Sequence, residues 1–340
     1  MSKDKTSETA PSCSDTPKPL PNPSTGSANP SASLPALWGY LQPALDHIVR
    51  SPTDNPSKAP ALEVSYHMGV HTAVYNYFTS QADTHAVPPP KTVPAAPPIP
   101  RDDIKPSGTD LYEQLDRYFA DTAHEILLGA PHDDGALIHY LLPCFYRYSA
   151  GAQAVNRLLN YVNRHYVKRA IDEDKGWLRL TDVLDAVAKS IQADDTRGRI
   201  QQRMKERKTQ ELKRWGYFEG APPEVVARTE ACAEAASTPD RVVTLSAMAL
   251  RRFRTEVIDP LLAVPKVKKG GKKKKPPADS DKPTLPKGRL ARAVKELLEG
   301  ERHDPDRRNK TARELAVLLR TVGIRVDHPL RKKLDRFATD

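Results

Sequence analysis

The sequence predicts an all-α protein in which helices are separated by long disordered segments. Apolar residues recur at steps of three and four along several stretches, the pattern of helices with one buried face. The 340 residues include 32 prolines, 16 glycines and 38% hydrophobic residues. This composition is low in apolar residues for a chain that packs along its whole length, so we expect a helical core interrupted by disordered segments.

The bulk composition favours a soluble intracellular protein. Its three cysteines, Cys13, Cys144 and Cys232, lie far apart, which suits a reducing compartment and gives no CxxC metal spacing. No apolar run approaches the roughly 18 residues that a membrane span needs. The N-terminus is polar and rich in Pro and Ser, unlike a signal peptide. We therefore expect no membrane association.

The N-terminal part of the chain predicts a disordered tail followed by two helices. Residues 1–33 are rich in Ser, Pro, Thr and Lys and offer little to bury. Leu34 to Ile48 has the spacing of an amphipathic helix, and Pro43 inside it favours a kink. Ser65 to Gln81 predicts a second helix with two apolar or aromatic sides, formed by Val70, Val74 and Tyr77 and by Met68, His71 and Tyr75. Such a helix either lies centrally in a bundle or keeps one face for a partner.

A proline-rich loop and two more helices are expected next. Residues 82–108 cannot form a helix and favour a semi-rigid spacer over a ligand of SH3-type domains. Thr109 or Asp110 is expected to cap a third helix that ends at Gly129. A fourth helix is expected to begin at Gly135 and to end before Ser149–Gly151.

The stretch from Ala152 to Asp174 carries the most informative pattern. Tyr161, His165 and Lys168 fall on one face at i, i+4 and i+7, beside Asn and Arg residues. An aromatic ring among such polar side chains is typical of interfaces. Packing under a loop and binding a partner remain equal interpretations of Tyr161 from composition alone. The neighbouring, core-facing stripe comprises Val155, Leu158, Leu159, Val162 and Tyr166.

Residues Tyr161–Arg169, YVNRHYVKR, resemble the Tyr-Leu-Asn-Arg-His-Trp-Val-Arg-Arg segment of cullins, the scaffolds of multisubunit ubiquitin ligases. Thr72–Tyr77 matches the Thr-x-Val-Tyr-Asn-Tyr pattern of the second cullin helix. Val257–Leu261 is similar to the end of the first cullin repeat, and Glu296–Arg302 to the opening helix of the second. The chain therefore resembles the N-terminal region of an SCF-type cullin.

This resemblance implies a cullin-repeat-like helical bundle or solenoid with long disordered segments, matched over roughly residues 34–174 and 246–322. The implied order is a tail (1–33), the first-repeat helices (34–174), a basic helical insertion (175–243), the last helix of that repeat (244–265), a Lys-rich linker (266–286) and the start of a second repeat (287–340).

The resemblance also implies a non-catalytic scaffold in ubiquitin-dependent protein degradation. In SCF-type cullins, the second helix and the helix with the Tyr-x-Asn-Arg-His motif hold a BTB/POZ-fold adaptor, which in turn holds F-box proteins. The chain shows no counterpart of the C-terminal cullin half, so no RING subunit is expected. By position, the partner-binding residues would be His67, Met68, His71, Tyr75, Tyr161, Arg164, His165 and Lys168.

Two alternatives remain open. The basic helix expected over residues 197–214 and the lysine run 266–275 would suit a helical nucleic-acid-binding protein, whose affinity would fall steeply with salt. The adaptor interpretation is favoured over it. A degenerate cullin fragment without a partner is the third interpretation. The lysine run also weakly indicates nuclear import, so we expect the cytoplasm and the nucleus as locations.

No motif of common catalytic chemistry is found in the sequence. GxxxxGK[ST], GxSxG, HExxH and paired CxxC patterns are all missing. Cys144 and His139 stand five positions apart, which is poor spacing for contact on a helix. We therefore expect no enzyme activity, no cofactor and no metal site.

Overall fold

The structure is a computed structural model that describes residues 29–53, 55–86, 107–190, 195–264, 288–300 and 305–339. Helices and short connections make up these ranges, and no strand occurs within them, which confirms the all-α class. None of the helices in these ranges is both long and apolar enough to cross a membrane.

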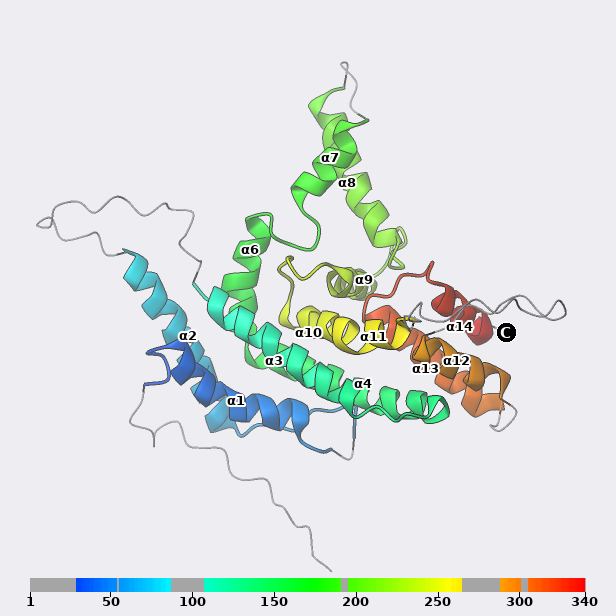
Figure 1. Ribbon diagram of the computed structural model, residues 1–340. Coiled ribbons are helices and arrows are strands. Elements are labelled where there is room, and N and C mark those ends of the chain that lie inside the picture. Colours follow the sequence, from blue (N-terminus) through cyan, green and yellow to red (C-terminus); the bar gives the residue numbers. More distant parts are fainter. Residues whose placement is uncertain are drawn as a thin grey trace, which may run out of the picture.

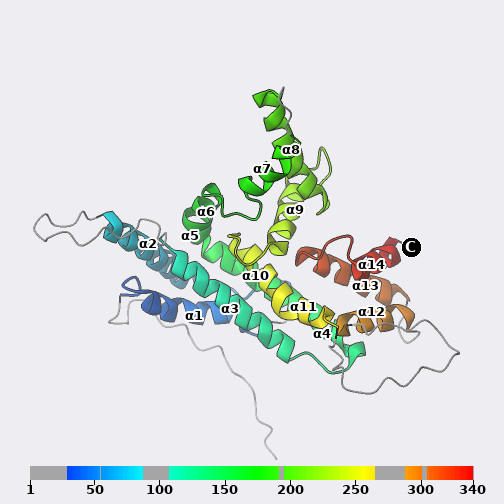
Figure 2. The same cartoon turned by 45° about the horizontal axis from the view of Figure 1, so that its top comes forward.

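The central helix is α4 (Asp134–Leu158), which contacts α1 (Leu34–Arg50), α10 (Leu245–Phe253), α12 (Arg289–Glu299) and α13 (Pro305–Thr321). A further helix, α3 (Thr109–Leu128), packs on α10. Figures 1 and 2 show α1, α3 and α4 running alongside one another, with α10 laid against them. We call this helical assembly, with α2 and α11–α14, the body.

A continuous apolar core holds the body together. Phe145 and Tyr148 lie 5.2 and 5.3 Å from the ring of Phe253, measured between ring centroids. The Tyr148 hydroxyl is within hydrogen-bond distance of the Phe119 and Ala249 carbonyls, at 3.1 and 3.0 Å, so this buried polar atom is satisfied. The predicted core stripe of residues 155–166 is buried in this core.

Two predicted boundaries near the proline-rich loop are wrong. The second helix, α2 (Val64–Ala86), continues through residues 82–86, so the loop begins later than expected. Gly108, with φ 88°, stands at the N-cap of α3, and no side chain caps this helix. A residue with positive φ suits glycine rather than Thr109 or Asp110, which lie inside the helix instead.

The stretch 152–174 is not one helix. Its first residues belong to α4, which runs uninterrupted through Ser149–Gly151 and ends at Leu158. The remainder forms α5 (Asn160–Val162), the π-helical segment η2 (Asn163–Val167) and α6 (Lys168–Asp172). Gly151 does not break the helix; a Cβ there would lie 3.1 Å from the Val49 Cα, so it allows α1 and α4 to approach closely.

The region predicted as an insertion contains three helices. Helices α7 (Leu180–Ala188) and α8 (Arg197–Lys213) contact each other, and α9 (Pro223–Ala236) packs on α10. Both views show α7 and α8 projecting away from the body, and we call this pair the arm (Figures 1 and 2). Thr196 caps α8, because its hydroxyl accepts the Arg199 amide.

The chain from Arg254 onward completes the body. The π-helical segment η3 (Arg254–Ile258) and α11 (Asp259–Leu262) continue from α10. Helices α12 and α13 lie within residues 287–340, the region expected to start a second repeat. A further helix that the sequence reading missed, α14 (Pro329–Thr339), packs on α13.

Most of the segments predicted to be disordered lie outside the described residues: 1–28 of the tail, 87–106 of the loop and 266–286 of the linker. The last residues of the predicted tail, however, are part of the body. The Ser31 hydroxyl donates to the Ala73 carbonyl at 3.1 Å, and the Ser33 hydroxyl accepts the Ala36 amide at the start of α1.

Candidate partner-binding surface

Tyr161 lies at the junction of the two segments predicted to form a binding surface. Its ring stacks on His165 at 4.0 Å and meets His71 and Tyr75 of α2 edge-on, at 6.2 and 5.6 Å between ring centroids. Such edge-to-face and stacked ring pairs are favourable contacts. The structure therefore brings four of the predicted residues into one group, which we call the tyrosine–histidine cluster (His71, Tyr75, Tyr161 and His165).

An exposed apolar ridge runs along α2 beside this cluster. Val64, Met68 and Tyr75 are 77%, 58% and 47% exposed. With His71 they follow the spacing i, i+4, i+7 and i+11, which places them on one helix face. Large apolar side chains left in water along one face are typical of interaction sites. Val64 was not among the predicted residues, although its position one turn before Met68 could have indicated it.

The opposite side of α2 anchors the ridge to the body. Val70, Val74 and Tyr77 are buried, as predicted for the core stripe. The Tyr77 hydroxyl donates to the Asp110 carboxylate, and the Gln81 side-chain oxygen accepts the Gly108 amide at 2.9 Å. These bonds fix α2 against the start of α3, so the ridge is presented by a rigid helix.

Phe78 supports the cluster from inside. This buried residue meets Tyr161 edge-on at 5.3 Å. Burial, with a smaller effect from Tyr75, raises the pKa of Tyr161, so its hydroxyl is a neutral hydrogen-bond donor near pH 7. The sequence analysis did not predict a role for Phe78 in the surface, because its position is typical of an ordinary core residue.

The second segment of the surface is fixed by an asparagine pair. The Asn163 amide donates to the Asn156 side-chain oxygen at 2.9 Å, and the Asn163 oxygen accepts the Leu245 amide at 3.1 Å. Asn156 in turn accepts the Ser246 amide at 3.2 Å. The free amides at the start of α10 thus determine where η2 lies. A π-helical turn at this place is a rare geometry that often occurs at functional sites.

Two cations extend from the same segment. Arg164 and Lys168 are exposed, and neither forms an ion pair with another residue in the described ranges. Their neighbour Arg169 is engaged instead, because it donates to the Ser107 carbonyl at 3.0 Å. Arg164 and Lys168 therefore place free positive charge beside the cluster.

His67, the remaining predicted residue, lies in different surroundings. It lines a hollow of about 460 Å³, whose other walls come mainly from residues 57–62 and from α4. The cluster residues are not part of this hollow. The structure thus groups Met68 and His71 with the surface through the α2 ridge, and it places His67 at the edge.

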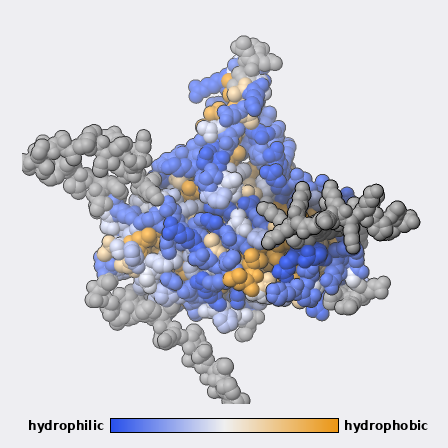
Figure 3. Space-filling view, in the orientation of Figure 1, coloured by the Kyte–Doolittle hydropathy of each residue, from blue (hydrophilic) through white to orange (hydrophobic). Residues whose placement is uncertain are grey.

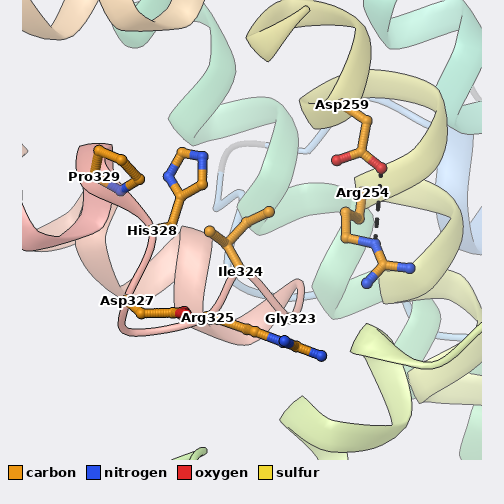
Figure 4. A pocket seen from close by; sticks show the side chains of 8 residues that line it. All are labelled: Arg254, Asp259, Gly323, Ile324, Arg325, Asp327, His328 and Pro329. Atoms are coloured by element: carbon orange, nitrogen blue, oxygen red, sulfur yellow. Dashed lines mark ion pairs between the residues drawn. The ribbon is translucent and has the colours of Figure 1, made fainter.

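A smaller pocket lies between α11 and the turn before α14, with a volume of about 410 Å³. Arg254 and Asp259 face each other on one side, at 3.9 Å between Nε and Oδ2, and His328 and Pro329 lie across from them (Figure 4). Its eight lining residues include no serine, threonine, cysteine or lysine nucleophile. Opposite charges line it together, so it offers neither a clear anion site nor a nucleophilic site.

Among the described residues, no group of three or more His, Cys, Asp or Glu side chains could hold a metal ion. No protein-family model, no curated protein and no solved structure matches the chain.

Proposed function

We propose that the chain is a non-catalytic scaffold module, similar to the adaptor-binding N-terminal part of a cullin, that binds a BTB/POZ-fold adaptor. The observation that carries this proposal is the meeting of α2 with the segment formed by α5 and η2, at Tyr161 and His165. The resemblance assigns the partner to these two segments, which are far apart in the sequence, and their side chains form one exposed surface.

The chemistry of the surface supports a protein partner. Met68 and Tyr75 provide flexible and aromatic anchors of the kind that dominate interface energetics. Arg164 and Lys168 would accelerate association with an acidic partner and fix its register more than they would add affinity. A partner that covers the ridge would bury its apolar side chains without burying an unpaired charge.

Calorimetry with an SCF-type BTB/POZ-fold adaptor at physiological salt tests the proposal. The double variant Met68→Ala, Tyr161→Ala removes two anchors, each contributing about 2 kcal/mol if central, so affinity should fall more than a hundredfold. The matched control is Val317→Ala, Val326→Ala, which truncates exposed apolar side chains of the body far from this surface in the sequence.

Tyr161 also touches buried Phe78, so its truncation could disturb packing. A second variant, Val64→Asp, Met68→Asp, changes only exposed ridge positions and should bind no better than the first. Circular dichroism checks that each variant keeps its helices. Equal affinity in the native chain and both surface variants, or no binding by a folded native chain, would refute the proposal.

A further inference from the structure

The arm presents a second charged surface, which the adaptor proposal does not use. Helices α7 and α8 point away from the body in both ribbon views (Figures 1 and 2), and every residue of α8 except Leu212 is exposed or half-buried. Hydrophilic residues cover most of the visible face of the arm (Figure 3). Only some of these charges are neutralised by ion pairs within the chain.

Helix α8 contains seven Arg or Lys residues and two Glu residues. Arg203 is neutralised by Asp195, at 2.7 Å, and Arg207 by Glu211, also at 2.7 Å. The other five cations have no ion-pair partner in the part of the chain that the structure describes: Arg197, Arg199, Lys205, Lys208 and Lys213.

The unpaired cations include an ordered row. Arg197, Gln201, Lys205 and Lys208 are exposed and follow the spacing i, i+4, i+8 and i+11, which places them on one face of α8. The row is about 16 Å long, since each helical residue adds about 1.5 Å. Each strand of duplex DNA offers a phosphate about every 3.4 Å along the axis, so the row can meet several phosphates.

The character of this row differs from that of the α2 ridge. It has no Met, Tyr, Trp or aliphatic side chain that could act as the buried anchor of a protein interface. The exposed apolar residues of the arm, Leu180 and Leu184, belong to α7 instead. Interfaces with nucleic acids are polar and strongly positive, and phosphate contacts supply most of their non-specific affinity.

We propose that α8 binds the phosphodiester backbone of a nucleic acid through Arg197, Lys205 and Lys208, with Gln201 as a further hydrogen-bond donor. The binding is not specific for sequence, because backbone contacts position a protein without reading bases. This function is independent of adaptor binding, since the two surfaces share no residue.

Fluorescence anisotropy of the full chain with a 20-base-pair DNA duplex, and with an RNA duplex of the same length, tests this inference across a salt series. The variant Lys205→Gln, Lys208→Gln removes two phosphate contacts. The slope of log K against log salt is negative, and its magnitude should decrease by about 1.8. At 0.1 M salt this corresponds to roughly 60-fold weaker binding. The control Lys310→Gln, Lys332→Gln removes the same charge from exposed positions on α13 and α14 and should change the slope little.

The two duplexes distinguish the source of the backbone, and preference for either supports the inference. Circular dichroism confirms that α8 persists, and Lys205→Arg, Lys208→Arg should retain native affinity because it keeps the charges. Equal salt slopes for the native chain and the glutamine variant would overturn the proposal and assign any binding to the lysine run 266–275. Binding of poly-glutamate without binding of either duplex would also overturn it.

Discussion

The body and the arm are both helical, but different interactions hold them. In the body, α4 is surrounded by other helices, and the core around Tyr148 and Phe253 is continuous and apolar. At the base of the arm, the separate apolar cluster consists of Trp215, Cys232 and Ala233, with Trp177 packed against it. Beyond this base, the ion pair between Arg203 and Asp195, whose side chain is 2% exposed, joins α8 to the residues before it.

Because of this difference, the two regions need not unfold together. Burial of apolar surface is the main source of stability, and the arm has little of it. Segments with few buried contacts open locally at a lower free energy than the whole fold. A body that stays folded while the arm opens would leave the tyrosine–histidine cluster intact. The two proposed functions are therefore separable by mutation.

The largest expected effect is a difference in the free energy of unfolding between two Leu→Ala substitutions, one in the body and one in the arm. Leu115→Ala in the body removes a fully buried side chain (0% exposed) and should cost about 2–5 kcal/mol in the free energy of unfolding. Leu212→Ala in the arm removes one that is 6% exposed and should cost about 1 kcal/mol or less in the same measurement, because the arm opens locally. Urea denaturation gives both values.

Hydrogen exchange tests the same difference for the amides of each helix separately. Amides of α8 should exchange faster in the Leu212→Ala variant, while amides of α4 keep their native protection. If both leucine variants lowered the global stability equally, the arm would be part of the same cooperative unit, and the comparison would fail.

Two glycines provide a matched pair of smaller effect. A Cβ at Gly151 would lie 3.1 Å from the Val49 Cα and 3.3 Å from the Ile48 carbonyl oxygen, so Gly151→Ala should force α1 and α4 apart at a cost of about 1–3 kcal/mol. At Gly198 in the arm, no atom lies within 4 Å of the added Cβ. Gly198→Ala should therefore stabilise α8 by up to about 1 kcal/mol through helix propensity. Thermal denaturation followed by circular dichroism should move in opposite directions for the two variants, and a shift of the same sign would contradict this account.

The smallest effect concerns alkaline pH. The Tyr66 hydroxyl donates to the Tyr40 carbonyl at 2.6 Å. Burial, with a smaller effect from Tyr40, raises the pKa of Tyr66 from 10.0 to about 12. Because the pKa is higher in the folded state, the contribution of Tyr66 to stability is present below pH 10 and is lost as the pH rises toward 12.

Tyr66→Phe cannot ionise, so its stability should fall less steeply between pH 10 and 12 than that of the native chain, in urea titrations at each pH. Helices α7 and α8 contain no tyrosine, so hydrogen exchange in the arm should show no such difference between the two proteins. Parallel pH profiles would show that this tyrosine does not contribute to the alkaline response.

The sequence predicted helix positions well where apolar periodicity was strong, as in α1, whose predicted span from Leu34 to Ile48 agrees with Leu34–Arg50. It failed where backbone geometry or tertiary contacts decided the outcome. Gly151 resembles a helix break in sequence, yet its lack of a side chain serves the contact with α1. The break after Leu158 has no composition signal, because Asn163 and Asn156 bind amides of α10, which are distant in sequence.

The candidate surface was predicted in the same uneven way. Seven of the eight predicted residues lie on the α2 ridge, in the cluster or on the adjoining cationic segment, whereas His67 faces a separate hollow. The spacing of residues in the sequence assigns them to faces of a helix, but it does not give their distances to residues on a second helix. The contact between Phe78 and Tyr161 depends on how α2 packs, which no local pattern encodes.

The π-helical segment Asn163–Val167 has a consequence for changes in chain length. A π turn holds one residue more than an α turn, so deleting one residue there can restore α-helical geometry and leave the flanking helices in phase. Loss of Arg164, for example, would keep Ala170, now 4% exposed, in the core and Ile171, now 43% exposed, outside. The same deletion within α4 would rotate every later residue of that helix by about 100° and turn its apolar stripe toward solvent. Insertions and deletions among homologous chains are therefore expected to gather in this segment and in Arg254–Ile258, while α4 keeps its length.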